Sequence, residues 1–157
     1  MLKSDPYDAI ETRMSKPDSL PSLALKRRII GLFLGLYFFH VLHVLEEIWG
    51  EFRAMRILGR DVFIAGNAFL LAIPLVVFFY VLDDRRMALR LGQIYAIIMI
   101  LNGFGHGIAV LLTGHYFGYY AGAISGIGLI AFGFPLALSL EKSLKRGQVS
   151  TFNKVLH

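Results

Sequence analysis

Long apolar runs separated by short polar segments dominate this chain and determine its expected fold. Four of the runs are long enough to cross the hydrocarbon core of a bilayer as helices, for which about 20 residues are needed. They cover residues 28–50, 61–82, 87–113 and 116–140. The connections between them are short, which favours antiparallel neighbours. The pattern therefore predicts an all-α integral membrane protein, a four-helix up-down bundle.

The segments outside these runs are polar and carry most of the positive charge. Residues 1–27 contain several prolines and are expected to be a disordered cytoplasmic tail, followed by a membrane domain over 28–141 and a second cytoplasmic tail over 142–157. With the N-terminus inside, 13 of the 16 Lys and Arg residues fall on the inner side. Because positive residues accumulate on the cytoplasmic side of membrane proteins, both termini are predicted to be cytoplasmic.

Composition agrees with a membrane protein, since 56% of the 157 residues are apolar and only 17% are charged. The net charge of +5 does not indicate nucleic acid as a partner, because Lys and Arg flank the apolar runs instead of covering one polar face. The chain has no cysteine. This excludes disulfides, thiolate metal sites and a cysteine nucleophile, so any bound metal must have nitrogen and oxygen ligands.

Glycines recur at every fourth position in the last two runs. Gly103 and Gly107 lie in the third, and Gly118, Gly122 and Gly126 lie in the fourth. Small residues at this spacing allow helix backbones to approach closely. We therefore expect these two spans to pack against each other or to form a homodimer with a second copy of the chain.

The first span carries a polar stripe near its end. At 100° per residue, His40, His43 and Glu47 share one helix face, and Glu46 lies just beside it. Each ionisable group near the bilayer interior costs roughly 2.5 to 3.5 kcal/mol on insertion scales. Such residues usually face the bundle interior and have a function, so this stripe is the strongest functional signal in the sequence.

Other spans place polar residues at the same depth. With the predicted topology, the polar end of span one lies in the outer half of the bilayer, and spans two, three and four each reach that layer. The residues concerned are Asn67, Asn102, His106 and, at the start of the fourth span, Tyr120. All four spans therefore contribute to one predicted polar site.

Imidazole and carboxylate groups in this arrangement suit a metal ion. His43 and Glu47 are one turn apart, and His106 from a facing helix would complete a three-ligand site with an open position for water or substrate. Glu46 is predicted as a further ligand or, with Glu47, as a catalytic acid–base group. The expected supporting residues are His40, Asn67, Asn102 and Tyr120. Zinc and iron both fit nitrogen and oxygen ligands.

The leading hypothesis is a metal-dependent enzyme that acts on a lipid or another small apolar molecule within the bilayer. Three alternatives use the same residues. A metal-free His/Glu pair could act as an acid–base catalyst on a lipid, as double-bond isomerases do. The residues could relay a proton or ion in a small transporter. They could also form a purely structural hydrogen-bond network.

The run His43-Val44-Leu45-Glu46-Glu47 resembles the signature of a bacterial family of small integral membrane proteins with an HXXEE motif. The resemblance extends over about residues 30–140. It includes Asn67, Asn102, His106 and Tyr120-Ala121-Gly122, where Ala121 replaces a proline that the family often has. The resemblance implies a multi-pass protein of the bacterial inner (plasma) membrane with a polar site, and it does not specify a reaction.

Overall fold

The computed structural model describes residues 20–83, 85–117 and 120–155, and helices dominate these ranges. The helices are α2 (Leu20–Trp49), α3 (Arg53–Leu58), α4 (Arg60–Leu82), α5 (Arg86–Thr113) and α6 (Ala123–Val155). No strand occurs in the described ranges. Each of the four long helices contains a segment long and apolar enough to cross a membrane. The predicted all-α four-helix fold of a multi-pass membrane protein is confirmed.

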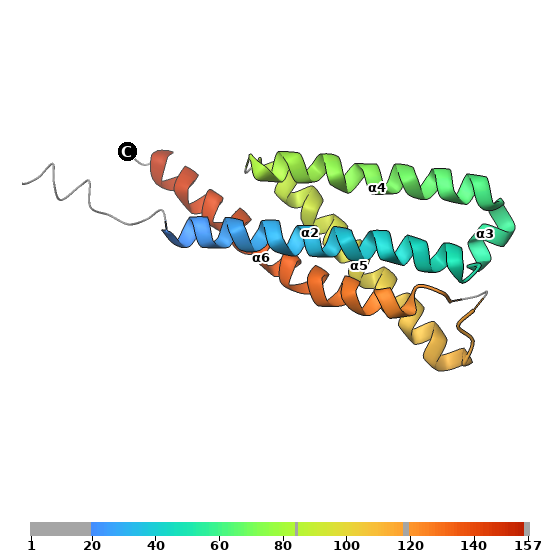
Figure 1. The fold of residues 1–157 in the computed structure, drawn as a ribbon. Helices are drawn as coiled ribbons and strands as arrows, with labels where there is room; N and C mark the ends of the chain where they lie inside the picture. The colour runs from blue at the N-terminus through green and yellow to red at the C-terminus, as the bar shows by residue number, and fades with distance from the viewer. Residues whose placement is uncertain (1–19, 84, 118–119, 156–157) are drawn as a thin grey trace, which may run out of the picture.

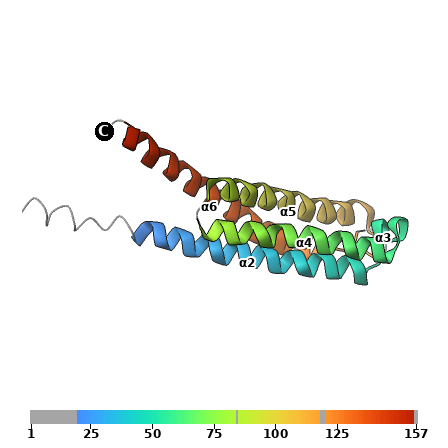
Figure 2. The ribbon, with the colours of Figure 1, turned by 90° about the horizontal axis from the view of Figure 1, so that it is seen from above.

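The long helices run up and down along one bundle (Figures 1 and 2). The short helix α3 lies at one end, where it connects α2 to α4. The start of α2 and the end of α6 lie at the opposite end, and both extend beyond α4 and α5 in the two views. The bundle therefore has an α3 end, at α3, and a terminal end, where α2 starts and α6 ends.

Two helices extend beyond the predicted spans. Helix α2 begins at Leu20, inside the segment expected to be a disordered tail, and α6 continues to Val155 through the predicted C-terminal tail. Their apolar segments are shorter, Leu23–Trp49 and Ala123–Arg146. Lys and Arg are good helix formers, so their appearance ends the apolar segment without ending the helix. The remainder of the predicted N-terminal tail, residues 1–19, lies outside the described residues.

The fourth span begins later than predicted. Residues 116–122 were expected to open it, but α6 begins at Ala123. Gly122 immediately before it has a φ of +115°, a backbone conformation outside the right-handed helical region. The described residues 114–117 and 120–122 therefore belong to the connection between the two helices at the α3 end of the bundle, hereafter the α5–α6 loop.

The apolar core lies between α2, α5 and α6. Its largest fully buried side chains are Phe33, Leu36, Leu129, Leu136 and Leu140. Helix α4 contributes less, because most of its apolar side chains are exposed on the surface of the bundle. A helix with this exposure is stable in contact with lipid, and its loose packing leaves space beneath it for a cavity.

Helices α5 and α6 approach each other through glycine, as the sequence predicted. A Cβ atom on Gly103 would lie 2.5 Å from the carbonyl oxygen of Gly126, which is too close for any side chain. Gly107 faces open space, and Gly122 precedes α6 instead of lying in it. Gly118 lies outside the described residues, and among the other glycines of the pattern the close approach of α5 and α6 is made by Gly103 and Gly126.

Candidate metal centre

The polar stripe of α2 faces the interior of the bundle. His40, His43 and Glu47 are buried, and the side chain of His43 is only 1% exposed. Leu45 and Trp49, on the opposite face of the same turns, are exposed. The helix is therefore rotated so that its most polar residues are the ones removed from lipid, as the cost of exposing ionisable groups to hydrocarbon requires.

His43, Glu47 and His106 meet in one buried cluster. One ligand atom from each residue lies within 4.8 Å of the other two. Glu47 Oε1 is 3.6 Å from His43 Nε2 and 3.4 Å from His106 Nε2. Ligand atoms about 2.1 Å from a tetrahedral metal are separated by about 3.4 Å. The Glu47 oxygen thus already lies at about this spacing from both imidazoles, and the structure brings together the three residues predicted as principal ligands.

Hydrogen bonds to backbone carbonyls orient both imidazole rings. His43 Nδ1 lies 3.0 Å from the carbonyl oxygen of Gly122, and His106 Nδ1 lies 3.4 Å from that of Tyr120. A carbonyl oxygen only accepts, so each Nδ1 carries the hydrogen and each neutral ring has its lone pair on Nε2. Histidine ligands of metals commonly show this arrangement, which fixes both the tautomer and the ring orientation.

The two carbonyls come from the α5–α6 loop, which therefore belongs to the site. Tyr120, predicted as a supporting residue, acts through its backbone oxygen. Ser125 at the start of α6 adds a contact of 3.0 Å to His43 Nδ1. Nothing in the residue pattern pointed to Ser125, and Gly122 was singled out for helix packing and for the family resemblance, because the contribution of both residues to the site depends on the path of the loop.

Two further residues contact the histidine rings. Asn102, a predicted support, donates from Nδ2 to His43 Nε2 over 2.9 Å. Phe52, between α2 and α3, packs its ring 5.0 Å from that of His106. The residue pattern does not indicate a role for Phe52, since an aromatic residue in a connection is typical of many membrane interfaces. Together these contacts restrict the rings from the α5 side and from the α3 end.

The structure does not bring Glu46 into the cluster. Its two carboxylate oxygens accept hydrogen bonds from the backbone N–H groups of Ile124 and Ser125 and from the hydroxyl of Tyr116. The pKa of Tyr116 is raised by burial and by this carboxylate, so its hydroxyl remains a donor. The role of Glu46 as ligand or general base stays a prediction, and in the structure both of its oxygens are engaged at the start of α6. Its carboxylate neutralises the free N–H groups there.

We expect Glu46→Gln to destabilise the protein by about 1–2 kcal/mol, because a charge-assisted cap at a helix N-terminus is lost. Thermal unfolding in detergent measures this change. Glu51→Gln is the matched control, since Glu51 is exposed and pairs with Arg56 on the surface, where such pairs contribute about 0–1 kcal/mol. Equal stability of the two variants would contradict the capping role.

His40 and Asn67, predicted as supports, lie beside the cluster and do not contact it directly. His40 Nδ1 is 3.1 Å from the hydroxyl of Tyr95, and Asn67 donates to the carbonyl of Phe63 in its own helix. Both residues line a cavity of about 560 Å³. Their contribution is therefore to the polarity of that cavity.

The cavity lies between α2, α4 and α5 and reaches the cluster. His43, Glu47 and Asn102 form part of its wall. Much of the remaining wall is apolar and continues to the outer surface, where Leu58, Val62, Leu70 and Ile98 are each more than half exposed. The cluster is thus accessible from the surface that faces lipid.

Comparison of the chain with known protein families, with curated proteins and with solved structures finds no match. The functional argument therefore depends on the geometry of the site.

Proposed function

We propose that His43, Glu47 and His106 bind a divalent metal ion, and that the protein is a metal-dependent enzyme acting on a lipid or another small apolar molecule. The observation that carries this proposal is the pair of oriented histidines. In both residues Nδ1 donates a hydrogen bond to a carbonyl oxygen of the α5–α6 loop, and Nε2 lies within 3.6 Å of the same Glu47 oxygen. A structural hydrogen-bond network would be satisfied by many geometries, whereas a metal site needs three convergent lone pairs.

The ligand set supports zinc or iron. Two imidazoles and one carboxylate are the protein ligands of several hydrolytic zinc enzymes, and they also form the facial triad of non-haem iron enzymes. Asn102 donates to the His43 lone pair, so a metal at that atom would displace this hydrogen bond. The metal would act as a Lewis acid or activate a bound water.

The cavity supports an enzyme over a purely structural metal. Structural sites have four protein ligands, whereas catalytic sites leave a position open. Here three ligands are present, and the cavity reaches two of them. Its apolar wall fits a hydrocarbon chain, while His40, Asn67 and Asn102 provide polar contacts for a functional group near the metal. We therefore infer a substrate with an apolar body and a polar reacting end.

We further propose that the chain crosses the bacterial inner membrane with both termini in the cytoplasm, as its Lys and Arg distribution and its resemblance to the HXXEE-motif family indicate. The site would then lie in the outer half of the bilayer. Its substrate would enter from the lipid phase beside α4.

Metal analysis of the purified protein tests the proposal. We expect about one zinc, iron or manganese ion per chain. When total bacterial lipids are incubated with the protein, mass spectrometry should show a product that chelation abolishes and that metal restores. Metal-free protein with no affinity for these ions would contradict the proposal. A product that forms in chelator and is lost in Glu47→Gln would instead establish the metal-free acid–base mechanism.

A further inference from the structure

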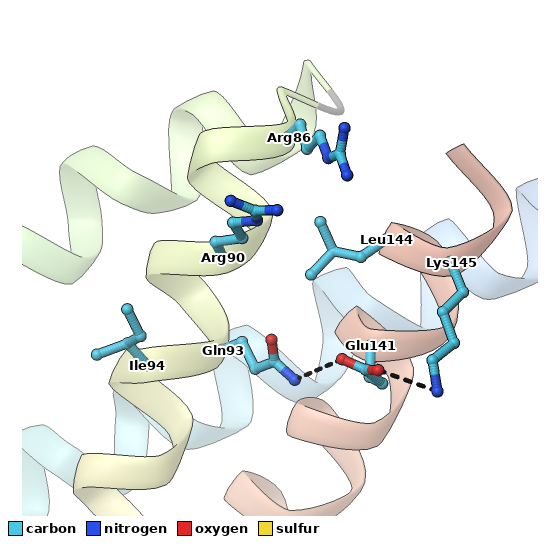
Figure 3. A pocket seen from close by; sticks show the side chains of 7 residues that line it. All are labelled: Arg86, Arg90, Gln93, Ile94, Glu141, Leu144 and Lys145. Atoms are coloured by element: carbon cyan, nitrogen blue, oxygen red, sulfur yellow. Dashed lines mark hydrogen bonds and ion pairs between the residues drawn. The ribbon is translucent and has the colours of Figure 1, made fainter. Parts of the chain in front are cut away.

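A second cavity lies at the terminal end of the bundle, between α5 and α6 and away from the metal centre. Its volume is about 360 Å³. Arg86, Arg90 and Gln93 contribute to it from α5, and Glu141, Leu144 and Lys145 contribute from α6 (Figure 3). Nothing in the proposed function uses these residues, so their convergence requires a separate explanation.

The two arginines are oriented toward the space between the helices and are not neutralised. In Figure 3 both side chains extend from α5 toward the region beside Leu144. Within the described ranges no carboxylate forms an ion pair with Arg86 or Arg90. Arg86 is also the first residue of α5, and no side chain caps that helix end. Its free N–H groups and its dipole add to the positive potential.

Glu141 is the one carboxylate in this cavity, and its charge is already matched. It accepts from Gln93 Nε2 over 3.0 Å and pairs with Lys145 Nζ at 3.0 Å. Three cations and one carboxylate leave the cavity with an excess of positive charge. A guanidinium group offers a planar fork of N–H donors that matches the oxygens of a phosphate. The cavity therefore favours an anion with phosphate oxygens.

The position of the cavity determines which molecule can present that anion. Arg86 is the first residue of one apolar span, and Lys145 is next to the last residue of another, Arg146. This is the level at which lipid headgroups meet the protein. Ile94, one turn farther into the apolar span than Arg90, and Leu144, next to Lys145, add apolar wall to the cavity. A ligand with a phosphate next to a hydrocarbon body matches both parts.

We propose that this cavity binds the phosphate-bearing headgroup of an anionic membrane lipid. With the inferred topology the terminal end faces the cytoplasm, where anionic lipids and basic pockets between helices commonly meet. Basic residues at the ends of spans also orient a chain in the membrane. Orientation of the chain in the membrane requires only positive charge near the ends of the spans. Lipid binding requires the two arginines at the cavity, so substitutions inside and outside the cavity distinguish the two roles.

The experiment uses the full chain in detergent and native mass spectrometry with dioleoylphosphatidylglycerol. We expect one bound lipid, and we expect Arg86→Gln/Arg90→Gln to weaken its binding by about tenfold or more, as the loss of two cations implies. Arg27→Gln/Arg28→Gln is the matched control. It removes the same charge from exposed positions near the start of α2, outside the cavity, and should retain the lipid.

A second variant tests the site by increasing affinity. Glu141→Gln removes the carboxylate and frees Lys145, so phosphatidylglycerol should bind about fivefold more tightly. Dioleoylphosphatidylcholine, whose choline group meets the arginines unfavourably, should bind weakly to all variants. The proposal would be overturned if Arg86→Gln/Arg90→Gln and Arg27→Gln/Arg28→Gln lost the lipid equally. It would also be overturned if Glu141→Gln left the affinity for phosphatidylglycerol unchanged. Competition by soluble glycerol 3-phosphate at the same affinity as the lipid would also overturn it and identify a soluble phosphate as the ligand.

Discussion

Replacement of His43 or His106 by alanine is expected to lower the metal affinity of the protein by about 100-fold or more. Changes in residues that only orient a ligand already cost 10–100-fold, and removal of one of three ligands should cost more. Both rings have Nε2 close to the same Glu47 oxygen, so the two variants should behave alike. The metal affinity is measured by titrating chelator-treated protein with metal and determining the bound metal by inductively coupled plasma mass spectrometry.

His115→Ala is the matched control for these variants. His115 lies in the α5–α6 loop, where its Nδ1 contacts the carbonyl of Thr113 and its side chain is exposed. Its loss should leave the metal affinity unchanged. His43→Gln preserves more of the buried volume, so it separates loss of a ligand from loss of packing. Wild-type metal affinity in a folded His43→Gln protein would contradict the assigned ligand set.

Gly122→Ala is expected to disrupt the site without removing any ligand. The backbone of Gly122 has a φ of +115°, which a residue with a side chain adopts only at a cost of about 1–3 kcal/mol. A Cβ atom here would also lie 2.5 Å from His43 Cε1 and 3.0 Å from His106 Nδ1. The imidazoles would have to move, so we expect at least a tenfold loss of metal affinity together with lower thermal stability.

Gly107→Ala provides the comparison for Gly122→Ala. Gly107 lies within α5 near His106, and a Cβ atom there would contact nothing within 4 Å. Alanine is the better helix former by about 1 kcal/mol, so this variant should be at least as stable as the wild type and should keep its metal. If Gly122→Ala bound metal as Gly107→Ala does, the α5–α6 loop could not be the element that orients the histidines.

These expectations give the α5–α6 loop a central position in the site. Its carbonyls at residues 120 and 122 orient the two histidines, and Glu46 holds the adjacent helix start through Ile124 and Ser125. The two neighbouring glutamates of α2 therefore have different tasks. Glu47 faces the candidate metal position, and Glu46 anchors the segment that orients the other ligands.

The sequence by itself determined the helices and the level of the polar site. The length of the apolar runs predicted four spans, and the helical period placed His43 and Glu47 on one face of the first span. Because consecutive spans run in opposite directions, the position of His106 along its own span predicted that it would reach the same layer. These inferences succeed because length, period and direction are properties of the chain alone.

Only the tertiary structure decided which glutamate belongs to the cluster and what orients the rings. Glu46 and Glu47 are adjacent, and a rotation of α2 by about 100° about its axis would place Glu46 where Glu47 lies, since each residue turns the helix by that angle. The rotation of the helix is set mainly by packing against α6 and α4. The path of the α5–α6 loop likewise depends on the positive φ of Gly122 and on the carboxylate of Glu46, two contributions that no periodic pattern records.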